Sequence, residues 1–205
     1  MDAKSRIEDV SFTGPKKRST GINGLNLLLE GGYPEGTIVM IYGTPTSGLD
    51  VAAHQFWKVE GEEGTYLMND GEVETGMIDV TDQHPEIYLN QLIGSRIVVD
   101  SLSVVVMKYG IDEALKFLRL TREEIRKRGA NMLFIVYTGI HTPMEMTRLM
   151  RAADVVIELT NHISQNEVER LICVQKVKDN PVPARMIPFN IMETGIEAST
   201  TSRVV

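Results

Sequence analysis

The chain has 205 residues, of which 42% are hydrophobic and 24% charged, and these values predict one soluble globular domain spanning residues 1–205. The longest apolar runs are only as long as a strand and the first ten residues have no apolar core, so we expect neither a membrane span nor a secretory signal. The net charge of −7 argues against broad nucleic-acid binding, and a single cysteine, Cys173, excludes an internal disulfide and favours a cytoplasmic location.

Short apolar segments alternate along the chain with segments of helical pattern. The predicted strands are residues 37–42, 65–68, 97–100, 132–137, 155–159, 170–177 and 189–192. Continuous apolar strands are typical of a parallel sheet with helices on both faces. The last two strands are close in sequence, which favours an antiparallel pair. The predicted fold class is therefore α/β, with a mainly parallel sheet and an antiparallel C-terminal edge.

Two helices have clear boundary signals. Residues 112–128 keep their apolar side chains on one face and are followed by Gly129, a typical helix stop. Residues 143–152 follow Thr142 as N-cap and begin with Pro143. Between residues 70 and 96 we expect a loop and one short helix near residues 86–93.

The loop after the first predicted strand has the glycine spacing of a phosphate-binding P-loop. The pattern G-x-x-x-x-G-K-[ST] requires two glycines, then lysine, then serine or threonine. Residues 43–50 supply both glycines, but Leu49 and Asp50 occupy the lysine and hydroxyl positions. The candidate loop residues are Gly43, Thr44, Pro45, Thr46, Ser47, Gly48, Leu49 and Asp50.

Four segments resemble the KaiC-like branch of the RecA ATPase superfamily. Residues 19–36 are similar to the lead-in T-G-I-x-G-L-D-x-L-L-x-G-G-I-P-x-G, and residues 96–103 to the Walker B strand that ends in D-S-L-S. Residues 175–178 look like the K-x-R segment, and residues 188–196 like the closing P-F-x-I-x-x-x-G-I. The resemblance implies a RecA-like P-loop fold, with Asp100 as the Walker B acid and a degenerate Walker A motif.

The two altered residues weaken the chemistry of a phosphate site. In a working P-loop the lysine neutralises the β- and γ-phosphates, and the hydroxyl binds Mg²⁺. Leu49 supplies neither charge nor donor. Asp50 adds a negative charge, and a like-charge pair at 4 Å costs roughly 4 kcal/mol before screening at an effective dielectric near 20. Asp50 either occupies the donors of its own helix N-terminus or points into solvent; both arrangements disfavour tight Mg-ATP binding.

The resemblance also identifies residues that bear on hydrolysis. The family's adjacent glutamates correspond here to Asn69 and Asp70, and Thr138 stands where the family often places a phosphate-sensing residue. Lys176 and Lys178 match a segment that reaches a neighbour's nucleotide, so they are possible trans contacts, or alternatively two charges on a partly exposed strand. The four histidines have no metal-ligand spacing with Cys173, and we expect no metal unless Asp50 and Asp100 hold Mg²⁺.

These observations favour a non-hydrolysing pseudo-ATPase that acts as a regulatory or protein-binding module. Its expected partner is itself, a paralogue or a peptide, in a homo- or hetero-oligomer, without nucleic acid or membrane and without a cofactor. Two alternatives remain: a divergent KaiC-like ATPase in signalling, with weak ATP binding and trans-assisted hydrolysis, and a recombinase-type DNA-repair accessory protein.

Overall fold

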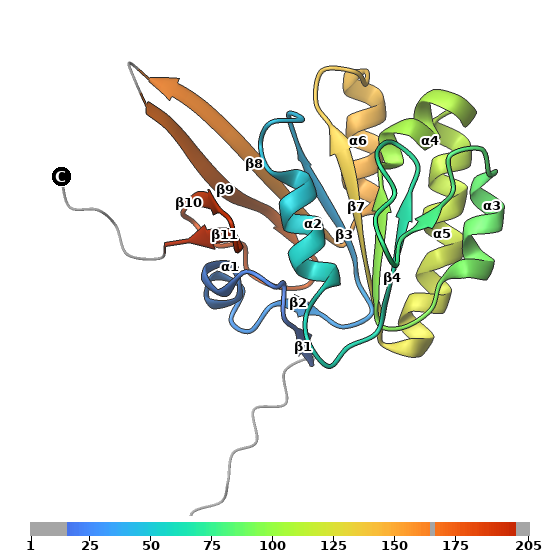
Figure 1. The fold of residues 1–205 in the computed structure, drawn as a ribbon, viewed down its shortest axis with the longest axis horizontal. Coiled ribbons are helices and arrows are strands. Elements are labelled where there is room, and N and C mark those ends of the chain that lie inside the picture. The colour runs from blue at the N-terminus through green and yellow to red at the C-terminus, as the bar shows by residue number, and fades with distance from the viewer. Residues whose placement is uncertain (1–15, 165–166, 200–205) are drawn as a thin grey trace, which may run out of the picture.

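The computed structural model describes residues 16–164 and 167–199, which form a central sheet with helices on both faces (Figure 1). Within this part of the chain the sheet has nine strands in the order β11-β10-β9-β8-β3-β7-β6-β4-β5. The strands are β3 (Ile38–Gly43), β4 (Gly64–Met68), β5 (Ile78–Asp79), β6 (Arg96–Asp100), β7 (Asn131–Tyr137), β8 (Val155–Ser164), β9 (Glu167–Val177), β10 (Ile187–Met192) and β11 (Gly195–Ala198). A small ribbon, β1 (Lys17–Arg18) with β2 (Tyr33–Pro34), lies apart from this sheet.

The helices form two layers. They are α1 (Asn23–Leu28), α2 (Leu49–Trp57), α3 (Pro85–Tyr88) with the 3₁₀ turn η1 (Leu89–Gln91), α4 (Leu102–Tyr109), α5 (Ile111–Arg128) and α6 (Pro143–Ala152). Side chains of α1 and α2 share one apolar core with the sheet, and those of α3 to α6 share the other. Strands β3, β4, β5, β6, β7 and β8 run parallel, and β9, β10 and β11 continue antiparallel.

The predicted α/β fold with an antiparallel C-terminal edge is confirmed. The two helices with clear signals form: α5 ends before Gly129, whose φ of 62° is left-handed, and α6 begins in a capping box between Thr142 and Glu145. The predicted short helix near residues 86–93 is α3 followed by η1.

The hairpin of β8 and β9 is longer than predicted. The apolar run of β8 ends at Leu159, but β8 continues through polar residues because its antiparallel backbone pairing with β9 extends to the Ser164–Glu167 pair. Figure 1 shows this hairpin projecting beyond the body of the sheet. The sequence patterns also did not predict helices α1 and α4 or strands β1, β2, β5 and β11, and β5 lies in the segment where only a loop was expected.

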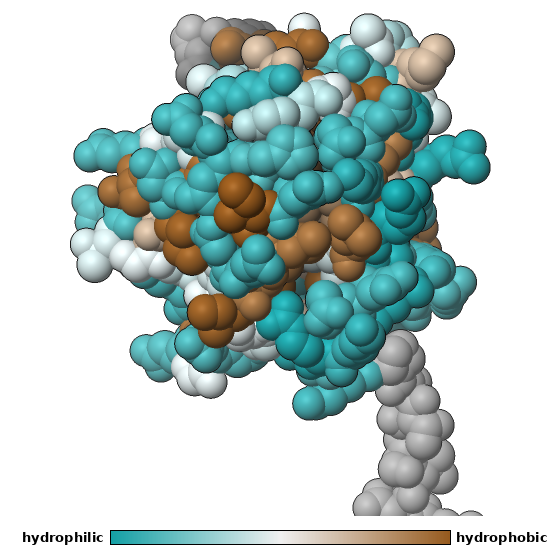
Figure 2. Space-filling view, turned by 90° about the vertical axis from the view of Figure 1, so that its right-hand side faces the viewer, coloured by the Kyte–Doolittle hydropathy of each residue, from teal (hydrophilic) through white to brown (hydrophobic). Residues whose placement is uncertain are grey.

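The outer face of α3, α4 and α5 is mainly hydrophilic, with separate hydrophobic side chains among the polar ones (Figure 2). Exposed apolar residues of these helices are Ile87, Met107 and Leu120. No helix within the described residues has both the length and the apolarity to cross a membrane.

A buried arginine ties the lead-in segment to the amino ends of the strands. Arg96 at the start of β6 is fully buried and donates to the carbonyls of Ser19 and Phe56 and to Glu62. Arg18 also donates to Glu62, at 2.6 Å. Burial alone raises the pKa of Glu62, but hydrogen bonds from Arg18, Ser95 and Arg96 outweigh it and lower the pKa to about 2. This network fixes residues 18–19 against the sheet.

Candidate functional site

The candidate site is the loop between β3 and α2, at the carboxyl ends of the parallel strands. Such edges are where open α/β sheets bind ligands. The Ser47 hydroxyl is fully buried and donates to the Thr44 carbonyl at 2.7 Å. Asn161, on the projecting hairpin, donates to the Thr46 carbonyl at 2.9 Å. The loop is therefore held by contacts of its own and by β8.

Two glycines are required by this loop. Gly48 precedes α2 with φ of 87°, a left-handed conformation that other residues rarely adopt. A Cβ on Gly43 would lie 2.4 Å from the Leu159 carbonyl oxygen and 2.5 Å from Ser47 Oγ. The glycine spacing that the sequence shares with P-loops thus has a steric cause that needs no ligand.

Leu49 and Asp50 begin α2 and face different surroundings. Leu49 is only 1% exposed and belongs to the apolar core that includes Ile196 of β11. Asp50 is exposed, in the first turn of the helix, where the helix dipole favours a negative charge. Within the described residues it forms no ion pair with lysine or arginine.

Asp100, at the end of β6, is 4% exposed and accepts a hydrogen bond of 2.6 Å from the Tyr66 hydroxyl. Tyr66 lies on β4 opposite Val98, so the Tyr66–Asp100 contact is a diagonal cross-strand pair. Burial raises the pKa of Asp100; the Tyr66 bond opposes this, while the charges of Asp70 and Asp50 raise it further. Asp50 and Asp70 are thus both near enough for their charges to act on Asp100.

The residues after β4 contact the end of β6. Asn69 is buried, and its side-chain oxygen accepts from the Ser101 backbone N–H at 2.6 Å. Asp70 accepts from the Ser101 hydroxyl at 3.0 Å. Asn69 therefore links the end of β4 to the end of β6. Asp70, which follows β4, contacts Ser101, the residue next to Asp100.

The end of β7 closes the other side of the loop. The Thr138 backbone N–H donates to the Gly43 carbonyl at 2.9 Å. Ser103 Oγ accepts from the Tyr137 N–H and lies 2.8 Å from His141 Nε2. Burial lowers the pKa of His141, with Glu145 opposing, which favours the neutral imidazole beside Ser103.

Lys176 and Lys178 lie near the amino ends of the parallel strands, whereas the loop lies at their carboxyl ends. Lys176 pairs with Val156 near the start of β8, whereas Gly43 pairs with Leu159. The Lys176 ammonium donates to the carbonyls of Met150 and Ala153 at the end of α6. The structure thus brings Asp50, Asp70 and Asp100 together and separates both lysines from them within one molecule.

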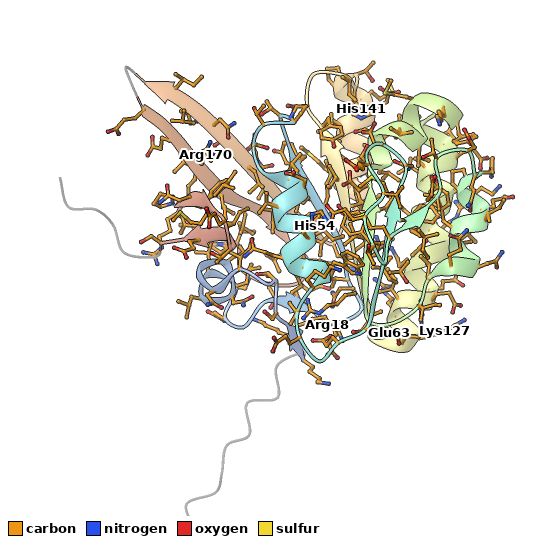
Figure 3. All side chains as sticks on the ribbon, in the orientation of Figure 1. Arg18, His54, Glu63, Lys127, His141 and Arg170 are labelled. Atoms are coloured by element: carbon orange, nitrogen blue, oxygen red, sulfur yellow. The ribbon has the colours of Figure 1, made fainter. Side chains whose placement is uncertain are left out.

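Tyr66 and His54 are site residues that the sequence analysis did not identify. The His54 ring on α2 stacks on Tyr66 with centroids 5.1 Å apart, and its Nε2 lies 3.6 Å from Glu74 Oε2. Figure 3 shows His54 in the middle of α2. A hollow of about 360 Å³ lies beside it, between α2 and the turn after β10. No local motif marks either residue, because the contacts that bring them to the site join helices and strands that are far apart in the sequence.

The substitution Tyr66→Phe tests the environment of Asp100. We expect a further rise in the Asp100 pKa, since the bond that favours the carboxylate is lost. Because the pKa of Asp100 is higher in the native state than in the unfolded state, the free energy of unfolding falls as the pH rises from the unfolded-state pKa to the native-state pKa. This fall should be larger in the variant. At neutral pH the loss should be about 1–2 kcal/mol. Carbon-13 carboxyl titration and urea unfolding measure the two effects; an unchanged Asp100 pKa would contradict the assignment.

Comparisons with known proteins agree with this geometry. The family model described as "ATPase: KaiC" matches residues 69–202, more than half of the chain. The crystal structure of a KaiC-like protein from the hyperthermophilic archaeon Pyrococcus horikoshii OT3 matches with a TM-score of 0.73 and 19% identity, over 91% of this chain and 100% of that one. At this identity the match shows a shared RecA-like fold. No curated protein matches the sequence significantly.

Proposed function

The chain belongs to the KaiC family of ATPases, and from that premise we propose that it is a non-hydrolysing member that acts as a regulatory or protein-binding module. The observation that carries the proposal is the position of Leu49. The residue that replaces the phosphate-binding lysine is buried in the apolar core and offers nothing to an anion.

The charge around the loop supports the same conclusion. Asp50, Asp70 and Asp100 all act on the Tyr137 hydroxyl, whose pKa is raised first by burial and then by these three charges. No lysine or arginine of the described residues forms an ion pair with any of the three. A triphosphate would enter a region of its own sign, which disfavours binding by several factors of ten by order-of-magnitude Coulomb arithmetic.

The residues present do not fit a magnesium nucleotide. The hydroxyl that would bind Mg²⁺ is replaced by Asp50, and Asp100 is engaged by Tyr66. Among the described residues, no group of three or more His, Cys, Asp or Glu is arranged to hold a metal ion. We therefore propose that the protein works without a cofactor in the cytoplasm.

What this site can offer is a recognition surface. Its carboxylates, the exposed residues Thr44, Pro45 and Thr46 and the projecting hairpin lie together at one edge of the sheet. We propose that this surface binds another protein chain, whether a copy of itself, a paralogue or a peptide of a different protein.

Titration with a fluorescent ATP analogue in the presence of Mg²⁺ tests the proposal. We expect no saturable binding up to millimolar nucleotide, an order of magnitude set by the missing charge. The matched control is Asp100→Ala, which should give the same flat titration. Micromolar binding by the parent that disappears in Asp100→Ala would overturn the proposal.

A divergent ATPase is the second candidate, because the Walker B acid Asp100 and both loop glycines are present. On this alternative Lys176 or Lys178 of a neighbouring copy would supply the missing charge. The same titration decides: binding that also requires Lys178, tested by Lys178→Ala, would favour the trans-assisted enzyme.

A further inference from the structure

A cavity of about 180 Å³ lies between helix α1, the ribbon of β1 and β2, and the loop that follows β9. We call it the side cavity. It lies apart from the candidate site, because Val177 at the end of β9 pairs with Val155 at the start of β8, whereas Gly43 pairs with Leu159. Most of its wall is apolar and includes Leu28, Leu29, Pro34, Val177, Val182 and Pro183.

The polar residues that line the side cavity have partners elsewhere or lie in solvent. The Lys17 ammonium donates to the Leu29 carbonyl at 2.7 Å, and the Asn180 side-chain nitrogen donates to the Lys178 carbonyl at 2.9 Å. The side chain of Glu30 is 88% exposed. The side cavity therefore offers an occupant mainly apolar contact.

The volume of the side cavity suits one aromatic ring. An apolar cavity of about 150 Å³ in a protein core is enough to bind benzene, and the side cavity is slightly larger. Its wall reaches the surface at Pro181 and Val182, which are both exposed. An aromatic side chain can therefore enter it from outside.

One phenylalanine of the chain lies outside the described residues. The chain has five phenylalanines, and the four within residues 16–164 and 167–199 are at most 4% exposed. The fifth is Phe12, in the segment of residues 1–15. Phenylalanine is among the residues most often buried in folded proteins, because its ring removes a large apolar area from water. Phe12 is thus an aromatic side chain in search of an apolar site.

The segment that carries Phe12 joins the described part of the chain at the side cavity. Lys17 of β1 pairs with Pro34 of β2, and both residues line the cavity. Phe12 precedes Lys17 by five positions, and five extended residues span at most about 17 Å. Gly14 and Pro15 lie between them, and this dipeptide is typical of a turn. The chain between Phe12 and Lys17 is therefore long enough to bend back to the cavity.

We propose that residues 1–15 fold back on their own chain and place the Phe12 ring in the side cavity. The segment then ties α1 and the β1–β2 ribbon to the loop of residues 180–183. The occupant is this segment because it ends at the cavity wall and carries an aromatic ring, whereas residues 165–166 and 200–205 carry none. The inference goes beyond the proposed function, since the candidate loop takes no part in it.

Nuclear Overhauser effects in the full chain, labelled at leucine and valine methyl groups, test the inference. We expect contacts from the Phe12 ring protons to the methyl groups of Leu29 and Val182, which line the side cavity. Phe12→Ala should abolish these contacts and shift both methyl signals, because the ring current is lost. Ile7→Ala changes another apolar residue of the same segment and should leave the contacts in place.

A double-mutant cycle in urea gives a second readout. Phe12→Ala and Val182→Asp should each lower the urea midpoint of unfolding, and the double variant should unfold at the midpoint of Val182→Asp alone, because residues in contact have non-additive effects. Val168→Asp is the matched control, since Val168 is 47% exposed against 44% for Val182 but lies near the other end of β9. Its effect should add to that of Phe12→Ala.

A sample that mixes isotope-labelled and unlabelled chains shows which copy supplies the ring, and the contacts should arise within one chain. Contacts that form only between chains would assign the side cavity to a second copy and overturn the inference. A folded parent without contacts between Phe12 and the cavity would also overturn it, as would additive effects of Phe12→Ala and Val182→Asp. None of these results bears on the proposed function, which the nucleotide titration decides.

Discussion

The double substitution Leu49→Lys with Asp50→Thr is expected to raise the affinity for Mg-ATP at least about a hundredfold, because it restores an attraction and removes a repulsion of several kcal/mol each before screening. The new lysine replaces a side chain that is 1% exposed, so it must turn out of the core toward the loop. We therefore also expect a loss of stability of about 1–3 kcal/mol. Isothermal titration calorimetry and urea unfolding measure the two effects.

The control for this experiment is Leu49→Met with Asp50→Thr. It keeps an apolar side chain of similar size at position 49 and changes the second residue in the same way. Affinity should rise less than in the lysine variant, and the difference between the two isolates the lysine charge. If a folded lysine variant binds no better than the parent, the loop is not a phosphate site that lost its charges.

Arg96→Met should destabilise the fold by about 3 kcal/mol, since removing one partner of a buried ion pair leaves polar groups uncompensated. The variant leaves the carbonyls of Ser19 and Phe56 without their donor and Glu62 with one arginine in place of two. Urea unfolding monitored by circular dichroism gives the change in free energy.

Lys116→Met is the matched control, because Lys116 pairs with Glu86 and Glu113 on the surface. Exposed ion pairs of this kind contribute about 0–1 kcal/mol. Equal losses in Arg96→Met and Lys116→Met would show that the buried network does not hold the lead-in segment to the sheet.

Elements with local signals could be predicted from the sequence. Helix α6 begins at Pro143 after Thr142 as predicted, because capping depends on neighbours along the chain. Helix α4 was missed because its V-V-V run favours strand by propensity, while packing of Val105 and Val106 into the core stabilises helix. Tertiary contacts overrode local preference there.

The candidate site was predicted only in part, for the same reason. The glycine spacing located the loop after β3, and the apolar run ending at Asp100 located β6, which lies two strands away in the sheet. The Tyr66 hydroxyl on Asp100 and the contact of Asn69 with Ser101 join residues more than thirty positions apart. Such contacts depend on the order of β4 and β6 in the sheet, which no single segment encodes.

The most direct measurement is a crystal structure of the protein grown with millimolar Mg²⁺ and a non-hydrolysable ATP analogue. The account predicts electron density in which Leu49 stays in the core, the Tyr66 hydroxyl remains on Asp100, and the loop from Gly43 to Asp50 holds no phosphate. Density for a triphosphate along that loop, with Mg²⁺ between it and Asp50 or Asp100, would contradict it.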